Sequence, residues 1–427
     1  MNFRPLDFQL RPLPVLWMAQ AVFFCTVSGA LAQESIRPSQ TGSLASEARK
    51  EPENDGHYFM KAGPIDFNAS ASVGLEYNDN VGLSEVNRQS DLIVRPEINL
   101  NSVWHVTTLN TLRFNIGVAY SAYTQHSDLN TRSILLDPGS ELSFDIYVGG
   151  ILKINVHDRF AIIQNPIDEP TLSNTARFDR FQNTAGVTAL LDFNDLKFVL
   201  GYDHFTYRTF SDEFDFLDRH EEQFYGSASL QLTDALVAGA DLSGAVVKYQ
   251  TGFNNNGTTW SAGPFLEATL SNYTKLRITA GYQGMNFDGN GENGDTTNFA
   301  GWYGSVTISQ RLNRYWSHSL SAGHEARLGL EVNFYEYDYV RYLAQWQINP
   351  RLNASIDGFV ENANESGTMV AQDSENSLRW GAGISLGWRL GNKVSLNLGY
   401  HYVNKNSDLP LRDYYQNVGT LGVSYTF

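Results

Sequence analysis

The sequence predicts an all-β chain that folds as an up-and-down antiparallel β-barrel of about 18 strands, with 16 strands as the alternative. Three observations carry this prediction. From about Ile65 to the end, apolar residues alternate with small or polar residues at the period of a β-strand. The connections between these segments are short and long in alternation along the chain, and the long ones are polar. Beyond residue 32 the chain has no long apolar run, so no transmembrane helix is expected.

The alternation identifies one face of each strand. Its clearest example presents apolar residues in register at Leu378, Trp380, Ala382, Ile384, Leu386, Trp388 and Leu390. Charged residues fall on the opposite face of these segments. A soluble β-sandwich also alternates, but its strands usually recur every 8–12 residues, which is shorter than the segments found here.

The connections distinguish two ends of the predicted barrel. Short turns are expected at Thr107-Thr108, Gly149-Gly150, Asn194-Asp195, Thr233-Asp234, Ser271-Asn272, Asn313-Arg314, Asn349-Pro350 and Gly391-Asn392. Long loops are expected near 78–90, 125–134, 157–182, 208–221, 250–257, 288–298, 325–331, 361–377 and 403–413. Short turns at one end and longer loops at the other are typical of transmembrane β-barrels.

The chain divides into three parts. Residues 1–32 carry two arginines, an apolar run and the small-residue sequence Ala30-Leu31-Ala32, which predicts a cleaved signal peptide. A membrane anchor is the less favoured alternative, because Gln20 breaks a short apolar run. Residues 33–64 are polar and aperiodic, and we expect a disordered periplasmic tail. Residues 65–427 form the barrel.

The last ten residues place apolar side chains at alternate positions and end on an aromatic residue: Leu421, Val423, Tyr425 and Phe427. This pattern resembles the C-terminal signal of bacterial outer-membrane β-barrel proteins. The resemblance implies location in the bacterial outer membrane, contact with its lipid and lipopolysaccharide, and recognition of Tyr425 and Phe427 by the barrel-insertion machinery. The aromatic content of 13% suits the aromatic girdles of a transmembrane barrel.

The segment Gly74-Leu75-Glu76-Tyr77-Asn78-Asp79-Asn80-Val81 is similar to the first-strand signature of the putative β-barrel porins, a group of bacterial outer-membrane proteins often associated with exopolysaccharide operons. The resemblance implies a single barrel with a porin-like or export-related function. It assigns no site residues. Independently, Asn78, Asp79 and Asn80 are turn formers at the outer end of the first strand.

Composition and motifs exclude several other functions. A formal net charge of −16 argues against a nucleic-acid partner. The chain lacks the HExxH and GxSxG motifs, and we predict no enzymatic activity, no catalytic residues, no cofactor and no metal site. The loop 288–295 resembles a calcium loop in composition, and an exposed hairpin tip is the favoured alternative.

Three functions remain. The first is a channel for diffusion of small hydrophilic solutes, with saccharides as the candidate solute, because about 18 strands enclose a lumen too wide for side chains alone to fill. The second is an exporter of an exopolysaccharide chain, favoured by aromatic residues on the inner face. The third is a plugged structural or adhesive barrel. Conduction in a planar bilayer separates the channel from the plugged barrel.

Charged residues that line the pore or its constriction are predicted from strand parity and from the longest loop. They are Arg95, Glu97, Arg113, Arg159, Asp168, Glu169, Arg177, Asp179, Arg180, Arg277, Arg311, Arg341, Arg379 and Arg389. The long loop, from about His157 to Gln182, also holds apolar residues that would be costly to leave in water: Phe160, Ile162, Ile163, Ile167, Leu172, Phe178 and Phe181. We expect this loop to fold into the lumen. The alternative is that it lies across the outer rim.

Deleting Phe427, or replacing it with a charged residue, is expected to lower insertion into the outer membrane. The reason is that the terminal aromatic residue is the proposed recognition feature, whereas one exposed position changes strand propensity little. The measurement is the surface yield of the variant in cells. A normal yield would contradict the C-terminal signal inferred here.

Overall fold

The structure is a computed structural model of the chain that describes residues 58–367 and 374–427. The predicted signal peptide and most of the predicted tail lie outside the described residues. Within the remainder of the tail, β1 (Met60–Ala62) pairs with residues 65–67 of the first long strand. The ordered sheet therefore begins a few residues before the predicted boundary at Ile65.

Eighteen long antiparallel strands build the described part of the chain. They are β2 (Ile65–Asn78), β3 (Asp91–His105), β4 (Asn110–Ala119), β7 (Glu141–Val148), β8 (Leu152–Ile163), β9 (Arg180–Phe193), β10 (Leu196–Thr209), β11 (Arg219–Thr233), β12 (Leu236–Tyr249), β13 (Gly257–Ser271), β14 (Thr274–Phe287), β15 (Phe299–Arg311), β16 (Trp316–Leu328), β17 (Phe334–Asn349), β18 (Leu352–Glu365), β19 (Asn376–Arg389), β20 (Val394–Ser407) and β21 (Tyr414–Thr426). The short strands β5 (Ala122–Tyr123) and β6 (Leu135–Leu136) extend this sheet.

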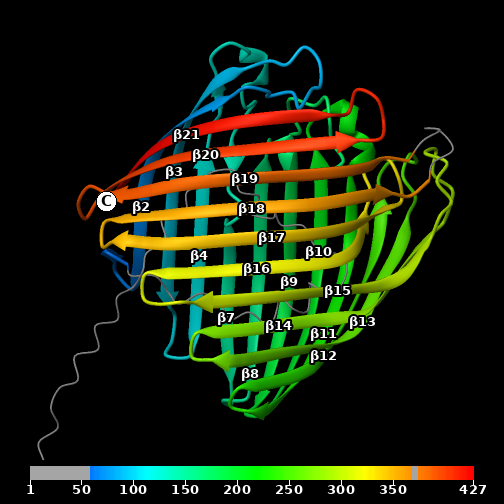
Figure 1. Ribbon diagram of the computed structural model, residues 1–427. Coiled ribbons are helices and arrows are strands. Elements are labelled where there is room, and N and C mark those ends of the chain that lie inside the picture. Colours follow the sequence, from blue (N-terminus) through cyan, green and yellow to red (C-terminus); the bar gives the residue numbers. More distant parts are fainter. Residues whose placement is uncertain (1–57, 368–373) are drawn as a thin grey trace, which may run out of the picture.

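The sheet closes on itself. Each long strand pairs with its neighbours in the chain, and β2 also pairs with β21, from Ser70 opposite Thr426 to Asn78 opposite Val418. In Figure 1 the strands of the front wall and those of the back wall cross in projection, because all strands are tilted relative to the barrel axis. The predicted 18-stranded up-and-down barrel is confirmed.

Strand parity separates an apolar outer face from a polar inner face. Large apolar side chains point outward and are exposed, such as Leu200, Trp302, Leu386 and Trp388. Residues that alternate with them face inward and are mostly polar. Within residues 58–367 and 374–427, no helix is long and apolar enough to span a membrane.

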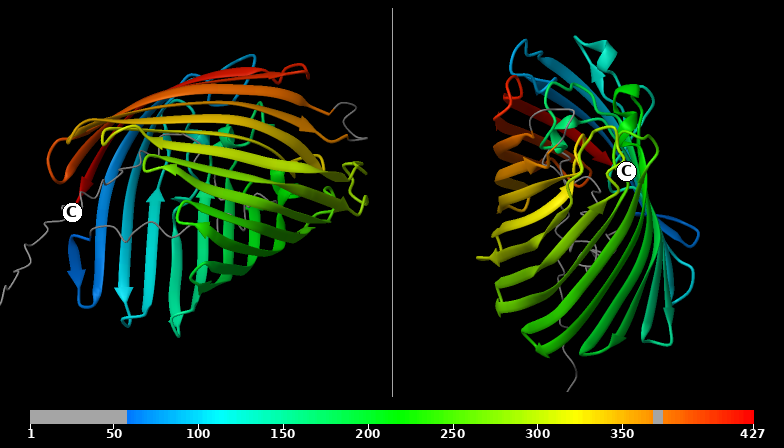
Figure 2. Two further views of the ribbon diagram at one scale, coloured as in Figure 1. Left: turned by 60° about the horizontal axis from the view of Figure 1, so that its bottom comes forward. Right: turned by 90° about the vertical axis from the view of Figure 1, so that its right-hand side faces the viewer.

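All eight predicted short turns fall at junctions of consecutive strands, and in three of them the first residue, Thr233, Ser271 or Asn349, is the last residue of a strand. Most of the long loops, by contrast, are shorter than predicted, because the strands continue beyond the apolar region with polar alternation, whereas the loop 288–298 has its predicted bounds. The loop predicted at 361–377 spans 366–375, and the loop predicted at 403–413 spans 408–413. Several of these loops gather at one end of the barrel (Figure 2).

Three short 3₁₀ helices lie in this loop region: η1 (Ser127–Leu129), η2 (Pro166–Asp168) and η3 (Asp212–Leu217). They give the loops fixed local shapes. In η2, the Asn165 side chain accepts a hydrogen bond from the backbone N–H of Ile167 at 3.1 Å. The proline at the start of η2 has a fixed φ angle that suits a helical turn.

Asp295 joins four of the loops. Its carboxylate accepts hydrogen bonds from the backbone N–H of Asn333 at 2.9 Å and from the Ser366 hydroxyl at 2.6 Å. It also accepts one from the backbone N–H of Thr297 at 2.9 Å, and its carbonyl accepts one from Asn255 at 2.6 Å. Asp295 is only 1% exposed. Asn293 and Asp295 are therefore buried, which the interpretation as an exposed hairpin tip did not foresee, whereas Asp288, Gly289, Asn290 and Glu292 are exposed as that interpretation expects.

The calcium alternative for this loop finds no support in the geometry. In the described part of the chain, no group of three or more His, Cys, Asp and Glu side chains is arranged to hold a metal ion. The Asp295 carboxylate instead faces hydrogen-bond donors of the protein.

Replacing Asp295 by Ala is expected to loosen the loop region, because each buried donor left unpaired costs about 1–3 kcal/mol. Asp288 in the same loop makes only peripheral contacts, with Asn290 at 3.3 Å and Asn256 at 3.5 Å, so Asp288→Ala is the matched control. The measurement is the rate of loop cleavage by an added protease in intact cells. Equal cleavage of the two variants would show that Asp295 does not hold the loops together.

Candidate functional site

The longest loop of the barrel spans residues 164–179 between β8 and β9 and is called the crossing loop below. The predicted boundaries, His157 to Gln182, are too wide. His157 and Arg159 belong to β8, and Arg180 belongs to β9. The loop nevertheless exceeds the length at which a connection usually has a function of its own.

The crossing loop reaches strands that are distant in the ring. The Arg379 guanidinium on β19 donates a hydrogen bond to the backbone carbonyl of Ile167. The Lys405 ammonium on β20 donates to the carbonyl of Thr171 at 3.2 Å and to the Ser173 hydroxyl at 3.1 Å. Between β8 and β20 the ring contains β7, β4, β3, β2 and β21. The loop thus crosses the ring as a chord at the loop end of the barrel, where Ser173 and Asn174 also donate to the carbonyls of Arg412 and Leu411 at 2.8 Å each.

Apolar side chains fix the two halves of the crossing loop. Phe178 is fully buried and packs in a cluster with Phe205, Tyr207, Phe214 and Leu217, against which Leu172 also packs. Ile167 packs against a second cluster, formed by Leu83, Val403 and Tyr414. Four other apolar residues assigned to the loop from the sequence lie instead in strands: Phe160, Ile162, Ile163 and Phe181.

Several predicted constriction charges are buried rather than open to solute. Arg180 is fully buried, lies 3.2 Å from Asp168, and donates to the carbonyl of Asn165 at 3.0 Å. Glu169 is 8% exposed. Arg180 and Asp168 hold the crossing loop in place through these contacts, which differs from the pore-lining role predicted for them.

Arg177 and Asp179 form an ion pair at 3.0 Å near the end of the crossing loop. Arg177 also donates to the carbonyl of Asp128 at 2.9 Å. Burial raises the pKa of the Asp179 carboxyl above its ordinary value, although the charges of Arg177, Arg132 and Arg180 act in the opposite direction. The pair therefore ties the crossing loop to the loop that contains η1.

The predicted wall residues lie on the inner face and mostly form ion pairs. Arg113 and Lys153 both pair with Asp145. The other pairs are Arg95 with Asp137 at 3.8 Å, Arg159 with Glu141 at 3.4 Å and Arg277 with Glu267 at 3.1 Å. Glu97 accepts a hydrogen bond from Asn99, and Arg311 and Arg389 lie exposed near the short turns.

Arg379 and Arg341 belong to one network on the opposite wall. Arg379 pairs with Glu361, whose other oxygen accepts a hydrogen bond from the Tyr337 hydroxyl. Arg341 donates to the same hydroxyl at 2.9 Å. Sequence parity identified the two arginines, but Glu361 was assigned to a loop and so was missed.

The main anchor of the crossing loop was also missed. Lys405 and Glu375 are both fully buried and lie 2.8 Å apart, and Arg412 pairs with the second oxygen of Glu375 at 3.0 Å. The alternation of β20 continues through Val403 to Lys405, which puts the ammonium on the inner face. This continued alternation could have placed Lys405 on the inner face from the sequence. The polar residues of the segment instead suggested a loop.

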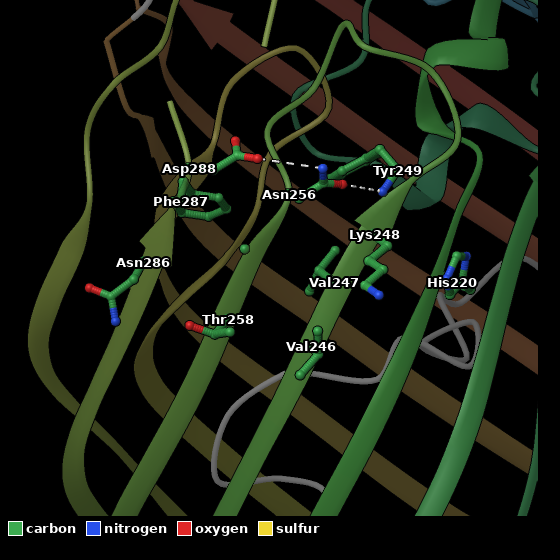
Figure 3. A pocket seen from close by; sticks show the side chains of 11 residues that line it. His220, Val246, Val247, Lys248, Tyr249, Asn256, Thr258, Asn286, Phe287 and Asp288 are labelled. Carbon is green, nitrogen blue, oxygen red and sulfur yellow. Dashed lines mark hydrogen bonds between the residues drawn. The ribbon is translucent and has the colours of Figure 1, made fainter. Parts of the chain in front are cut away.

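A hollow of about 540 Å³ lies at the loop end of β12–β14, away from the crossing loop. Its walls include outward-facing positions such as Val246 and Lys248, and the Asn256 side chain bridges Tyr249 and Asp288 (Figure 3). The hollow belongs to the outer rim of the barrel and not to its lumen.

Replacing Lys405 by Met is expected to lower the free energy of unfolding by about 3–5 kcal/mol, because it leaves a buried carboxylate without one of its partners. The matched control is Lys197→Met. The pair of Lys197 with Asp192 is as short, at 3.0 Å, but its side chains are 41% and 38% exposed, so about 1 kcal/mol or less is expected. Urea unfolding of the refolded barrels measures both changes. Similar losses would contradict the anchoring role of Lys405.

Comparisons with known proteins agree with this architecture. Residues 60–232 match the family model described as "Putative beta-barrel porin 2", which confirms the resemblance drawn from Gly74 to Val81. No curated protein sequence matches the chain.

Among solved structures, the chain is similar to OccK5 (OpdH) of Pseudomonas aeruginosa, with a TM-score of 0.47, 12% identity, and coverage of 86% of this chain and 99% of that one. It is also similar to OccAB3 of Acinetobacter baumannii, with a TM-score of 0.48, 10% identity, and coverage of 85% and 99%. The outer-membrane protein OpdK of P. aeruginosa gives the same TM-score, identity and coverage as OccAB3. The family match over residues 60–232 and the closed barrel with its apolar outer face together support a porin-like β-barrel of the bacterial outer membrane.

Proposed function

We propose that the barrel conducts small hydrophilic solutes through a lumen whose width is set by the crossing loop. The observation that carries this proposal is the course of that loop from β8 to its contacts on β19 and β20. A loop held at both ends and along its middle narrows the lumen without depending on the wall side chains. Saccharides are the candidate solutes.

The polar inner wall supports this proposal. Ion pairs and hydrogen bonds on the inner face leave no broad apolar surface for a lipid chain, while they suit a water-filled passage. Because cationic and anionic side chains pair along the wall, neither sign dominates the lumen. A neutral hydrophilic solute fits such a passage.

Two further roles complete the proposal. Residues 1–32 direct export from the cytoplasm, and the insertion machinery recognises the last strand through Tyr425 and Phe427. In the closed barrel these two rings contact each other, with centroids 5.2 Å apart, and both are exposed on the outer face. An exposed aromatic pair at the chain end supports recognition before the strand is enclosed by lipid.

Excising Asn165 to Thr175 is expected to raise single-channel conductance and to admit larger sugars, because it removes the segment that contacts β19 and β20. The measurements are conductance in planar bilayers and sugar uptake by proteoliposomes. An excision of Gly289 and Asn290, which are exposed in the loop after β14, is the control and should change neither. An unchanged conductance in a correctly inserted variant would place the constriction elsewhere, and a silent wild-type barrel would favour the plugged alternative.

A further inference from the structure

Exposed cations line part of the rim at the short-turn end of the barrel, opposite the loop end. They belong to the turns that join β13 to β14, β15 to β16, β17 to β18 and β19 to β20, which are neighbours along the rim. No Asp or Glu occurs in residues 268–280, 305–324, 345–356 or 384–397, which form these turns and the strand ends beside them. The exposed cations of this basic arc are Lys275, Arg311, Arg314, Arg351, Arg389 and Lys393.

Two neighbouring cations of the basic arc point into the mouth of the lumen. Ile308 is exposed on the outer face of β15, so Arg311, at an odd spacing from it, lies on the inner face. Lys275 pairs directly with Ser309, two residues before Arg311, and therefore lies on the same face. Diagonal neighbours of this kind are about 7–8 Å apart in a sheet, so both long side chains can reach one carboxylate or phosphate.

Other cations near this end are neutralised within the protein. Lys197 on β10 pairs with Asp192 at 3.0 Å. Arg277, the next inward-facing residue after Lys275 on β14, pairs with Glu267 at 3.1 Å. The basic arc itself contains no carboxylate, so its field extends into the mouth of the barrel.

Neutral hydrogen-bonding side chains fill the inner face between the cations. Ser317 pairs directly with Arg311, and Ser395 pairs directly with Arg389. Between these two serines, β17 and β18 present amide and hydroxyl side chains on the same face: Gln345, Gln347, Asn353 and Ser355. A solute with both an anionic group and several hydroxyl groups matches such a surface, because guanidinium groups bind carboxylates and phosphates while amides bind hydroxyls.

The outer face beside the basic arc meets lipid, whereas the inner face meets water. Trp346 and Trp388 are 45% and 51% exposed on the outer face, as in the aromatic girdle that marks a membrane surface. Arg389 follows Trp388 and therefore faces inward. Arg314 lies over the Tyr315 ring at 4.5 Å. The inward-facing cations are thus separated from lipid by the wall, which favours a water-soluble anion over a lipid head group.

We propose that the basic arc attracts acidic saccharides, whose carboxylate or phosphate groups bind Lys275, Arg311 and Arg389 at the short-turn mouth of the channel. This inference rests on the channel function proposed above and narrows its saccharides to acidic ones. Along the wall cations pair with anions, so selection by charge occurs at the mouth. A mouth of one sign raises the association rate of solutes of the opposite sign by about 10- to 1,000-fold at low salt.

The test uses the complete barrel in a planar bilayer of neutral lipid. Trigalacturonate, an acidic saccharide, and maltotriose, a neutral saccharide of equal length, are each added to either side, and interruptions of the ion current are counted. At low salt the association rate of trigalacturonate from the short-turn side is expected to exceed that of maltotriose by about tenfold or more. At about 1 M salt, where charges are screened beyond about 3 Å, the two rates should converge.

A double variant locates the effect. Lys275→Gln combined with Arg311→Gln is expected to lower the association rate of trigalacturonate about tenfold and to leave maltotriose unchanged, because only the charged saccharide responds to the lost charges. The control combines Arg208→Gln with Lys248→Gln. It removes two exposed cations at the loop end, so the rate from the short-turn side should stay unchanged.

The outcomes separate this inference from the channel function. A barrel that does not conduct would overturn the channel function, whereas a conducting barrel that trigalacturonate interrupts no faster than maltotriose would overturn the role of the basic arc alone. Equal slowing in the two double variants would show an effect of net charge and would also overturn it. Retention of added phosphatidylglycerol by the wild type but not by the Lys275 and Arg311 variant, without a response to trigalacturonate, would assign the arc to lipid head groups. The salt dependence of the wild type tests the inference even where a variant fails to insert.

Discussion

The closed ring of backbone hydrogen bonds is the constraint on which the rest of the structure depends. In the hydrocarbon of a membrane, an unpaired backbone N–H or C=O group costs several kcal/mol, so the first and last strands must pair. β2 and β21 meet this requirement from Ser70 opposite Thr426 to Asn78 opposite Val418. Beyond the paired region, Asp79 accepts two hydrogen bonds from Asn417, at 2.6 Å each, and the backbone N–H of Phe427 donates to the carbonyl of Ala69 at 3.0 Å. Hydrogen bonds thus close the junction of β2 and β21 at both of its ends.

Closure of the sheet also determines how the space inside the barrel is filled. A ring of this many strands encloses more space than its inward side chains fill, and the crossing loop spans the ring at its loop end. A loop in that position must satisfy its own backbone carbonyls away from bulk water. Arg379 and Lys405 meet this need for the crossing loop, and Glu361 and Glu375 in turn neutralise the two cations. Buried charges in this barrel are therefore a consequence of filling its lumen with backbone.

The outer face of the barrel was predictable from the sequence, whereas the interior was predictable only in part. The outer face requires a single property at every second residue, as in Leu386 and Trp388, and a local pattern expresses it fully. Burial of Asp295 depends on donors at positions 333 and 366, in other loops, so no local pattern indicates it. Lys405 lies between these cases. Its place on the inner face follows from the alternation of β20, but the polar residues around it have the composition of a loop.

Glycine and aromatic pairs stabilise the inner wall of the barrel. Glycine weakens a strand and leaves its backbone uncovered, and a ring from the neighbouring strand restores the cover. The barrel uses this pairing repeatedly, with Tyr225 over Gly201 and Tyr303 over Gly281 as further examples. These two rings are buried, at 7% and 5% exposure, so they stabilise the wall and contact no solute.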